Sequence, residues 1–236
     1  MNIEVLRQKI HAIEWREHKS NKVHSFGVGA IDVVLPGGGL QSGALHEWSG
    51  HQAAVWGVCA SILGRIAKNG GPILWCSTQI DVYPLGLQNY GLAPENVIFA
   101  KLDTTKDLLW AMEEGLNTPQ LGAIVAQTGS ISLSANRRLL LAAQKSNNSL
   151  FLLMDSKNAQ SSLSTSVSRW VVEPLPSEDA PGLWQDNGIG APRFAVTLSR
   201  CRGAITPQKW NIEWNATTLS FDLLSEHRLL AKCSSF

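Results

Sequence analysis

A charge excess of either sign is absent from this sequence. Twenty lysines and arginines are offset by 19 aspartates and glutamates, which leaves a formal net charge of +1. A chain this close to neutrality generates no overall field that would attract it to a polyanion. Any contact with DNA is therefore expected to be weak or indirect.

Closely spaced cysteines and histidines are also absent. The four cysteines (Cys59, Cys76, Cys201 and Cys233) lie far apart and form no CxxC pair, which argues against a disulfide framework and against a zinc site. The six histidines include no i, i+4 pair with a third ligand, so we expect no metal. No GxSxG motif is present, and no cysteine lies in a recognisable catalytic turn with a histidine nearby, so we expect no catalytic residue of these types.

Long apolar runs are missing as well. No stretch reaches the length that a membrane-spanning helix requires, and the first residues are too charged to form a signal peptide. Together with the dispersed cysteines, these absences predict a protein of the cytoplasm that does not associate with membranes.

What the sequence does contain is a regular alternation of strand and helix patterns. Strands are expected at 44–48, 73–76, 96–100, 121–126 and 150–154, and helices at 53–68, 83–90, 104–116 and 135–145. Residues 103–105 are suited to cap the third of these helices, and Ser134 the fourth. Short connections between alternating elements predict an α/β fold in which helices flank a mostly parallel sheet.

The pattern changes after residue 156. A serine-rich stretch at 157–168 is expected to be a flexible loop, and 174–192, which is rich in proline, glycine and acidic residues, a long turn or exposed loop. Strand-like runs at 169–173, 193–199 and 209–214 are expected to extend the sheet antiparallel at one edge, with Trp210 and Trp214 packed in the core or exposed for a partner. The predicted domain spans 23–224 and is followed by a tail at 225–236.

An amphipathic helix is predicted ahead of this domain, within residues 1–22. Ile3, Leu6, Ile10 and Ile13 recur at helical intervals and form one apolar stripe. This stripe can dock on the protein's own domain. Alternatively, it can pack against a partner or against a second copy of the chain, which would make the protein self-associate.

The most informative motif is a phosphate-binding loop that is incomplete. The P-loop pattern is Gly, four residues, then Gly-Lys-Ser/Thr. Counting from Gly50, the last three positions are Val55, Trp56 and Gly57. The position of the lysine that would reach the phosphates holds a neutral indole, and the position of the Mg²⁺-binding hydroxyl has no side chain. Binding of ATP in the usual mode is therefore not expected.

The residues around this motif resemble those of RecA-type recombinases. The resemblance rests on the spacing of residues that lead into the P-loop: Asp32, Leu35, Gly38, Gly39, Leu40, Gly43, Glu47 and Gly50. It implies a RecA-like fold over roughly residues 26–214. It also implies that Gln79 and Gln127 stand where the recombinases carry a catalytic acid and a Mg²⁺-binding aspartate. An amide can neither act as a base nor neutralise Mg²⁺, so neither enzymatic activity nor a bound cofactor is expected.

Several longer segments resemble the ImuA family of bacterial mutagenesis cassettes. They include LPGGGLQSGALHEWSG, GPILWCS, LLWAMEEGL, SANRRLLLAAQ and SRCRG. The resemblance implies a non-catalytic adaptor in SOS-induced translesion DNA synthesis. Its partner would be ImuB, a homologue of Y-family polymerases, with RecA as a second candidate. Two alternatives stay open: a SulA-like inhibitor that binds a tubulin-like division protein, and a degenerate ATPase.

Two pairs of arginines are candidate contacts for DNA phosphates or for an acidic partner surface. Arg137 and Arg138 lie near the start of a predicted helix, and Arg200 and Arg202 lie at the end of a predicted strand. The alternative for all four is a solvated surface charge with local ion pairs.

Overall fold

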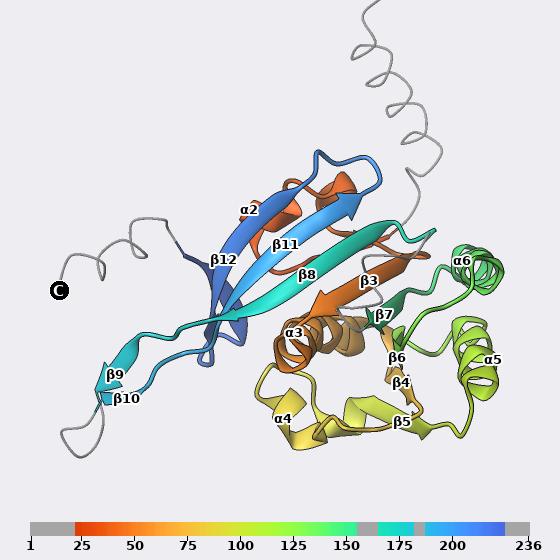
Figure 1. Ribbon diagram of the computed structural model, residues 1–236, viewed down its shortest axis with the longest axis horizontal. Coiled ribbons are helices and arrows are strands. Elements are labelled where there is room, and N and C mark those ends of the chain that lie inside the picture. Colours follow the sequence, from red (N-terminus) through yellow and green to blue (C-terminus); the bar gives the residue numbers. More distant parts are fainter. Residues whose placement is uncertain (1–21, 155–164, 182–186, 225–236) are drawn as a thin grey trace, which may run out of the picture.

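The computed structural model describes residues 22–154, 165–181 and 187–224 of the chain (Figure 1). The helix predicted within residues 1–22, most of the serine-rich stretch and the tail at 225–236 lie outside these residues. Within the described part of the chain, no helix is long and apolar enough to cross a membrane.

A nine-stranded sheet with the order β13-β12-β11-β8-β3-β7-β6-β4-β5 forms the centre of the molecule. Its parallel part consists of β3 (Leu45–Gly50), β4 (Ile73–Ser77), β5 (Val97–Lys101), β6 (Ala123–Thr128) and β7 (Leu150–Met154). All five strands were predicted from the sequence. Strand β7 is buried at every position, which explains why its sequence is continuously apolar.

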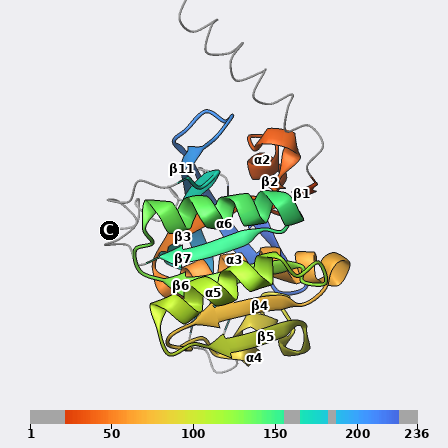
Figure 2. The ribbon, with the colours of Figure 1, turned by 90° about the vertical axis from the view of Figure 1, so that its right-hand side faces the viewer.

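Helices cover both faces of the parallel part. Helix α3 (Gln52–Gly70) lies on one face, and α5 (Thr105–Leu116) and α6 (Leu133–Ser146) lie on the other (Figures 1 and 2). The short α4 (Pro84–Gln88) and the 3-10 turn η2 (Pro94–Asn96) connect β4 to β5. Thr104 caps α5 as predicted. The cap of α6 is Ser132 rather than Ser134, because the helix begins two residues earlier than its apolar pattern indicates.

The antiparallel part adds β8 (Ser168–Leu175), β11 (Arg193–Cys201), β12 (Gln208–Asn215) and β13 (Ser220–Leu223), the last of which was not predicted. Strand β8 runs parallel to β3 and antiparallel to β11, so it joins the two halves. The prediction of a plain loop at 174–192 was wrong. This segment contains the end of β8 and a two-stranded arm of β9 (Asp179–Pro181) and β10 (Asn187–Ile189).

Stacked aromatic rings form the core beneath α3. The indole of Trp48 on β3 stacks on that of Trp170 on β8, with ring centroids 5.2 Å apart and planes 10° apart, and Phe151 on β7 stacks on its other side. Trp214 is buried and Trp210 is half-buried beside this cluster, as the core alternative predicted. These rings fix how strands of the two halves pack together.

The segment that leads into β3 closes one end of the sheet. It comprises β1 (Val23–His24), α2 (Gly29–Asp32), the turn η1 (Pro36–Gly38) and β2 (Leu40–Gln41), which pairs with β1. The glycine-rich turn is shaped by close backbone approach, because a Cβ atom on Gly39 would lie 2.6 Å from the carbonyl oxygen of His24.

Candidate functional site at the carboxyl edge of the sheet

The residues of the incomplete nucleotide site lie at one edge of the parallel sheet. Gly50 ends β3, Gln127 lies near the end of β6, and Gln79 follows β4 by two residues. The carboxyl ends of parallel strands meet at the edge where α/β proteins usually bind ligands. The structure therefore places all three residues at this edge.

The first element that a phosphate would need is a loop, and the chain has none here. Helix α3 begins at Gln52, three residues before Val55, and the amide of Val55 already donates to the carbonyl oxygen of His51 at 3.0 Å. The stretch that would wrap round a phosphate is thus helical from Gln52 onwards. Beyond the first turn, helical N–H groups donate to carbonyl oxygens of the helix, so they are not available to wrap round an anion as those of a P-loop do.

Strand β8 closes the remaining space beside Gly50. The amide of His51 donates to the carbonyl oxygen of Val172 at 3.0 Å, and the hydroxyl of Ser49 donates to that of Trp170 at 3.2 Å. Gly50 has φ +115°, and a Cβ atom on it would lie 2.2 Å from the Val172 oxygen. The glycine that opens a P-loop is retained here because β8 passes too close for a side chain.

The three positions that depart from the P-loop pattern form packing contacts. Val55 is buried in the core beneath α3, and Trp56 is half-buried against it. Gly57 provides the surface on which the ring of Tyr90 rests, since a Cβ atom there would lie 2.9 Å from the Tyr90 Cζ atom. Tyr90 in turn packs 5.1 Å from the ring of Trp214. Side chains fill this region.

The two glutamines differ in environment. Gln79 is exposed in a turn that Ser77 stabilises. The Ser77 hydroxyl accepts a hydrogen bond from the backbone N–H of Gln79 at 3.1 Å and donates one to the backbone carbonyl oxygen of Gln79. Gln127 lies beside Ser77 on the neighbouring strand, and its side-chain oxygen is buried without a hydrogen-bond partner. Neither side chain offers a carboxylate for a metal ion or for an attacking water.

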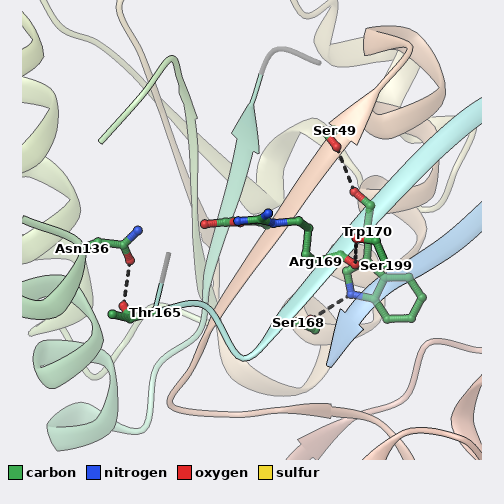
Figure 3. Close-up of polar contacts among 8 residues, drawn as sticks. Ser49, Asn136, Thr165, Ser168, Arg169, Trp170 and Ser199 are labelled. Carbon is green, nitrogen blue, oxygen red and sulfur yellow. Dashed lines mark hydrogen bonds and ion pairs between the residues drawn. The ribbon is translucent and has the colours of Figure 1, made fainter. Parts of the chain in front are cut away.

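A partly buried ion pair crosses from β3 to the start of β8, three residues before this edge. Arg169 Nε donates to Glu47 Oε2 at 2.8 Å, and the Glu47 side chain is 2% exposed. Figure 3 shows the Arg169 side chain extended, with Asn136 bonded to Thr165 on one side and Ser168 bonded to the Trp170 indole on the other. The sequence did not single out Arg169, because only the fold reveals that it lies opposite Glu47.

Other residues of the RecA-like spacing also have structural contacts. The Asp32 carboxylate accepts hydrogen bonds from the backbone amides of Phe26 and Gly27 and from the Ser25 hydroxyl. Leu35 and Leu40 are buried in the core. The lead-in is therefore held in place by packing and hydrogen bonds that need no nucleotide.

The structure does not gather the four candidate arginines into one surface. Arg137 and Arg138 are exposed on α6, where Arg138 forms an ion pair of 3.0 Å with Glu113 of α5. Arg200 and Arg202 are exposed at the end of β11 and in the turn that follows it. The two pairs therefore lie on separate elements.

Metal-binding or nucleophilic groups do not gather within the described residues either. These residues contain no group of three histidine, cysteine or acidic side chains that could hold a metal ion. Burial raises the pKa of Cys76 to about 12 and that of Cys201 to about 11, so both are neutral thiols near pH 7 and poor nucleophiles.

Comparison with known proteins gives the family. The chain is 32% identical over 206 residues to Protein ImuA from two strains of Caulobacter vibrioides, NA1000 / CB15N and ATCC 19089 / CIP 103742 / CB 15. The match covers 81% of this chain and 83% of each relative. The chain belongs to the ImuA family. No family model matches the sequence.

The fold of this ImuA chain is RecA-like, as the spacing of its motif predicted. The crystal structure of the RadB recombinase superposes with a TM-score of 0.60 and 15% sequence identity, covering 86% of this chain and all of that chain. At this identity the likeness shows the fold alone. The function of the chain depends on the residues at the edges of its sheet.

Proposed function

We propose that the chain is a non-catalytic RecA-like adaptor in SOS-induced translesion DNA synthesis. Its partner would be an ImuB-type homologue of Y-family polymerases, with RecA as a second candidate. Membership of the ImuA family supports this assignment. The proposal combines a RecA-like scaffold with a nucleotide edge that lacks the lysine, the hydroxyl and the acids of an ATPase.

The observation that carries the proposal is the start of α3 at Gln52. A phosphate cradle needs several convergent backbone amides from a loop, whereas here the amide of His51 donates to Val172, that of Val55 donates to His51, and only the first turn of the helix, residues 52–54, lies between them. An amide at position 127 cannot replace a Mg²⁺-binding carboxylate. A RecA-like fold without these groups supports a role in binding a partner, without ATP hydrolysis.

An adaptor needs a surface that its own fold leaves open, and the edge strand β5 is one. Among the described residues it pairs with β4 alone, and its outer row of backbone groups faces away from the sheet. Ile98 on this strand is 50% exposed. An open edge with an apolar side chain can accept a strand from another protein.

The arm of β9 and β10 is a second such surface (Figure 1). Arg193 anchors its base through ion pairs with Glu178 and Glu213, and Ile189, which pairs with Asp179 at the base of the arm, is 95% exposed. Residues 173–192 contain Glu173, Glu178, Asp179 and Asp186 and no lysine, arginine or histidine. This charge favours a basic protein surface over the phosphates of DNA.

Co-purification with the ImuB-type protein tests the proposal. We expect a complex with the wild-type chain, which Ile98→Lys or Ile189→Lys weakens at least tenfold. Val33→Lys is the matched control, because Val33 is 80% exposed and lies on α2–η1 away from both surfaces. A wild-type chain that forms no complex would contradict the adaptor role.

Calorimetry with Mg-ATP tests the non-catalytic part of the proposal separately. We expect no heat of binding up to millimolar nucleotide, and micromolar binding would overturn this part. Overexpression that produces filamentous cells without raising mutation frequency would instead favour the division inhibitor.

A further inference from the structure

A cavity of about 360 Å³ lies at the opposite edge of the sheet, where the parallel strands begin. Its wall includes Ser42 ahead of β3, Gly70 ahead of β4, Gly122 ahead of β6 and Asn148 ahead of β7. The last turns of α3 and the strand β1 complete it. A volume of this size is typical of sites for small molecules.

The polar lining of this cavity is basic and neutral. It includes Lys22, His24 and Arg65, together with the side chains of Ser25, Asn69, Asn147 and Asn148. Among the described residues that line it, none is acidic. In a chain whose net charge is only +1, this gathering of cations and amides is a local feature of the fold.

Arg65 is held rigidly in the wall. Its guanidinium donates to the Ser61 hydroxyl at 3.0 Å and to the carbonyl oxygen of Phe26. Gly27 lies directly over it, since a Cβ atom there would be 2.6 Å from the Arg65 Cζ atom. A positioned guanidinium loses little freedom when it binds a ligand, which favours recognition of a planar or tetrahedral anion.

The charge of Arg65 is only partly compensated. Within the described residues it forms no ion pair, and its Nε atom is buried without a hydrogen-bond partner. Burial lowers its pKa, and the nearby Asp32, whose carboxylate is already bonded to the backbone of residues 26–27, raises it in part. The Nε2 atom of His24 is likewise buried without a partner. An anion in the cavity would offset the charge of Arg65 in the wall, where the described residues supply no paired carboxylate.

We propose that this cavity binds an oxyanion, the phosphate or carboxylate group of a small molecule, with Arg65 and Lys22 as its cationic ligands. The site is separate from the carboxyl edge and from the surfaces β5 and β9–β10. It therefore stands or falls independently of the adaptor role.

Calorimetry on the full chain tests the site, with inorganic pyrophosphate and citrate as probes in a phosphate-free buffer at 0.15 M NaCl. We expect at least one probe to bind with a dissociation constant below about 1 mM, and the probe that binds more tightly identifies the group. Arg65→Gln should weaken binding at least tenfold and Lys22→Gln severalfold. Arg137→Gln removes the same charge from exposed α6 and should leave binding unchanged.

Because Arg65→Gln also removes contacts to Ser61 and Phe26, a second measurement locates the ligand without that variant. In NMR titrations of the wild-type chain, the bound anion should raise the pKa of His24, which burial and Lys22 lower to about 4 in the free protein. Dissociation constants above about 1 mM for both probes would overturn the proposal. So would equal losses in Lys22→Gln and Arg137→Gln, or a His24 pKa that does not respond.

Discussion

The two edges of the parallel sheet have opposite properties. At the carboxyl edge, where α/β proteins usually bind ligands, β8 pairs closely with β3 at Gly50, and the ring of Tyr90 rests on Gly57. At the amino edge, a cavity stays open and Arg65 and His24 keep buried nitrogen atoms without partners. The open volume of this fold thus lies at the edge opposite the one where α/β proteins usually bind ligands.

The closure of the carboxyl edge is tested most strongly at Gly50. Gly50→Ala should lower the free energy of unfolding by about 4 kcal/mol, because strain at φ +115° adds to the clash with the Val172 oxygen. Gly38→Ala is the matched control. Gly38 has φ +82°, and a Cβ atom on it would have no neighbour within 4 Å, so only strain of about 1 kcal/mol is expected. Urea denaturation measures both, and equal losses would show that β8 does not close the edge.

The segments next to the amino edge should be sensitive to acid. Burial lowers the pKa of His46, which bonds to Gln41 of β2, and of His24 on β1 to about 4 each. Unfolded histidine has a pKa near 6.5, so between pH 6.5 and 4 the unfolded chain binds more protons and stability falls as the pH falls. Each histidine should lower the free energy of unfolding by about 2.5 kcal/mol when the pH falls from 7.5 to 4.5.

Urea denaturation at a series of pH values measures this loss. In His46→Gln, stability should depend less steeply on pH than in the wild type, by about 1.4 kcal/mol per pH unit in this range. A variant with an unchanged slope would mean that His46 is protonated in the folded protein.

The smallest effect is expected where Tyr90 covers Gly57. Gly57→Ala introduces a Cβ atom 2.9 Å from the ring, and the better helix propensity of alanine offsets part of this clash. We expect a net loss of about 1 kcal/mol in the wild type and a gain of about 0.5 kcal/mol in a Tyr90→Ala background. Thermal or urea denaturation of the wild type, the two single variants and the double variant gives the coupling free energy between positions 57 and 90. Additive effects would mean that the ring does not rest on Gly57.

Local patterns in the sequence predicted most of the parallel half. Strand β7 is continuously apolar because it is buried on both faces, and Thr104 caps α5 because its hydroxyl accepts from the amide of Asp107. The start of α3 at Gln52 lies within one residue of the predicted start. Its consequence, that no loop remains, became clear only with the hydrogen bond from His51 to Val172.

The features that escaped prediction depend on residues far apart in the chain. The amino-edge cavity brings Lys22, Arg65 and Asn147 together, and no periodicity links these positions. The arm at 174–192 is rich in proline and glycine, which favour turns, and its two short strands pair with each other while Arg193 forms ion pairs with Glu178 and Glu213 at its base. Arg169 could be paired with Glu47 only once β8 was known to lie beside β3.

The position of β3 at the middle of the sheet has a consequence for how the chain is made. His46 lies 122 residues before its neighbour Ser168, and Leu45 pairs with Leu150 on the other side. Such distant pairings give a high contact order and slow folding. At about 10 residues per second, the ribosome needs roughly 12 s to go from the first of these strands to β8. During most of that interval both sides of a strand that is buried in the folded protein stay unpaired, so the nascent chain is most vulnerable to aggregation before its second half emerges.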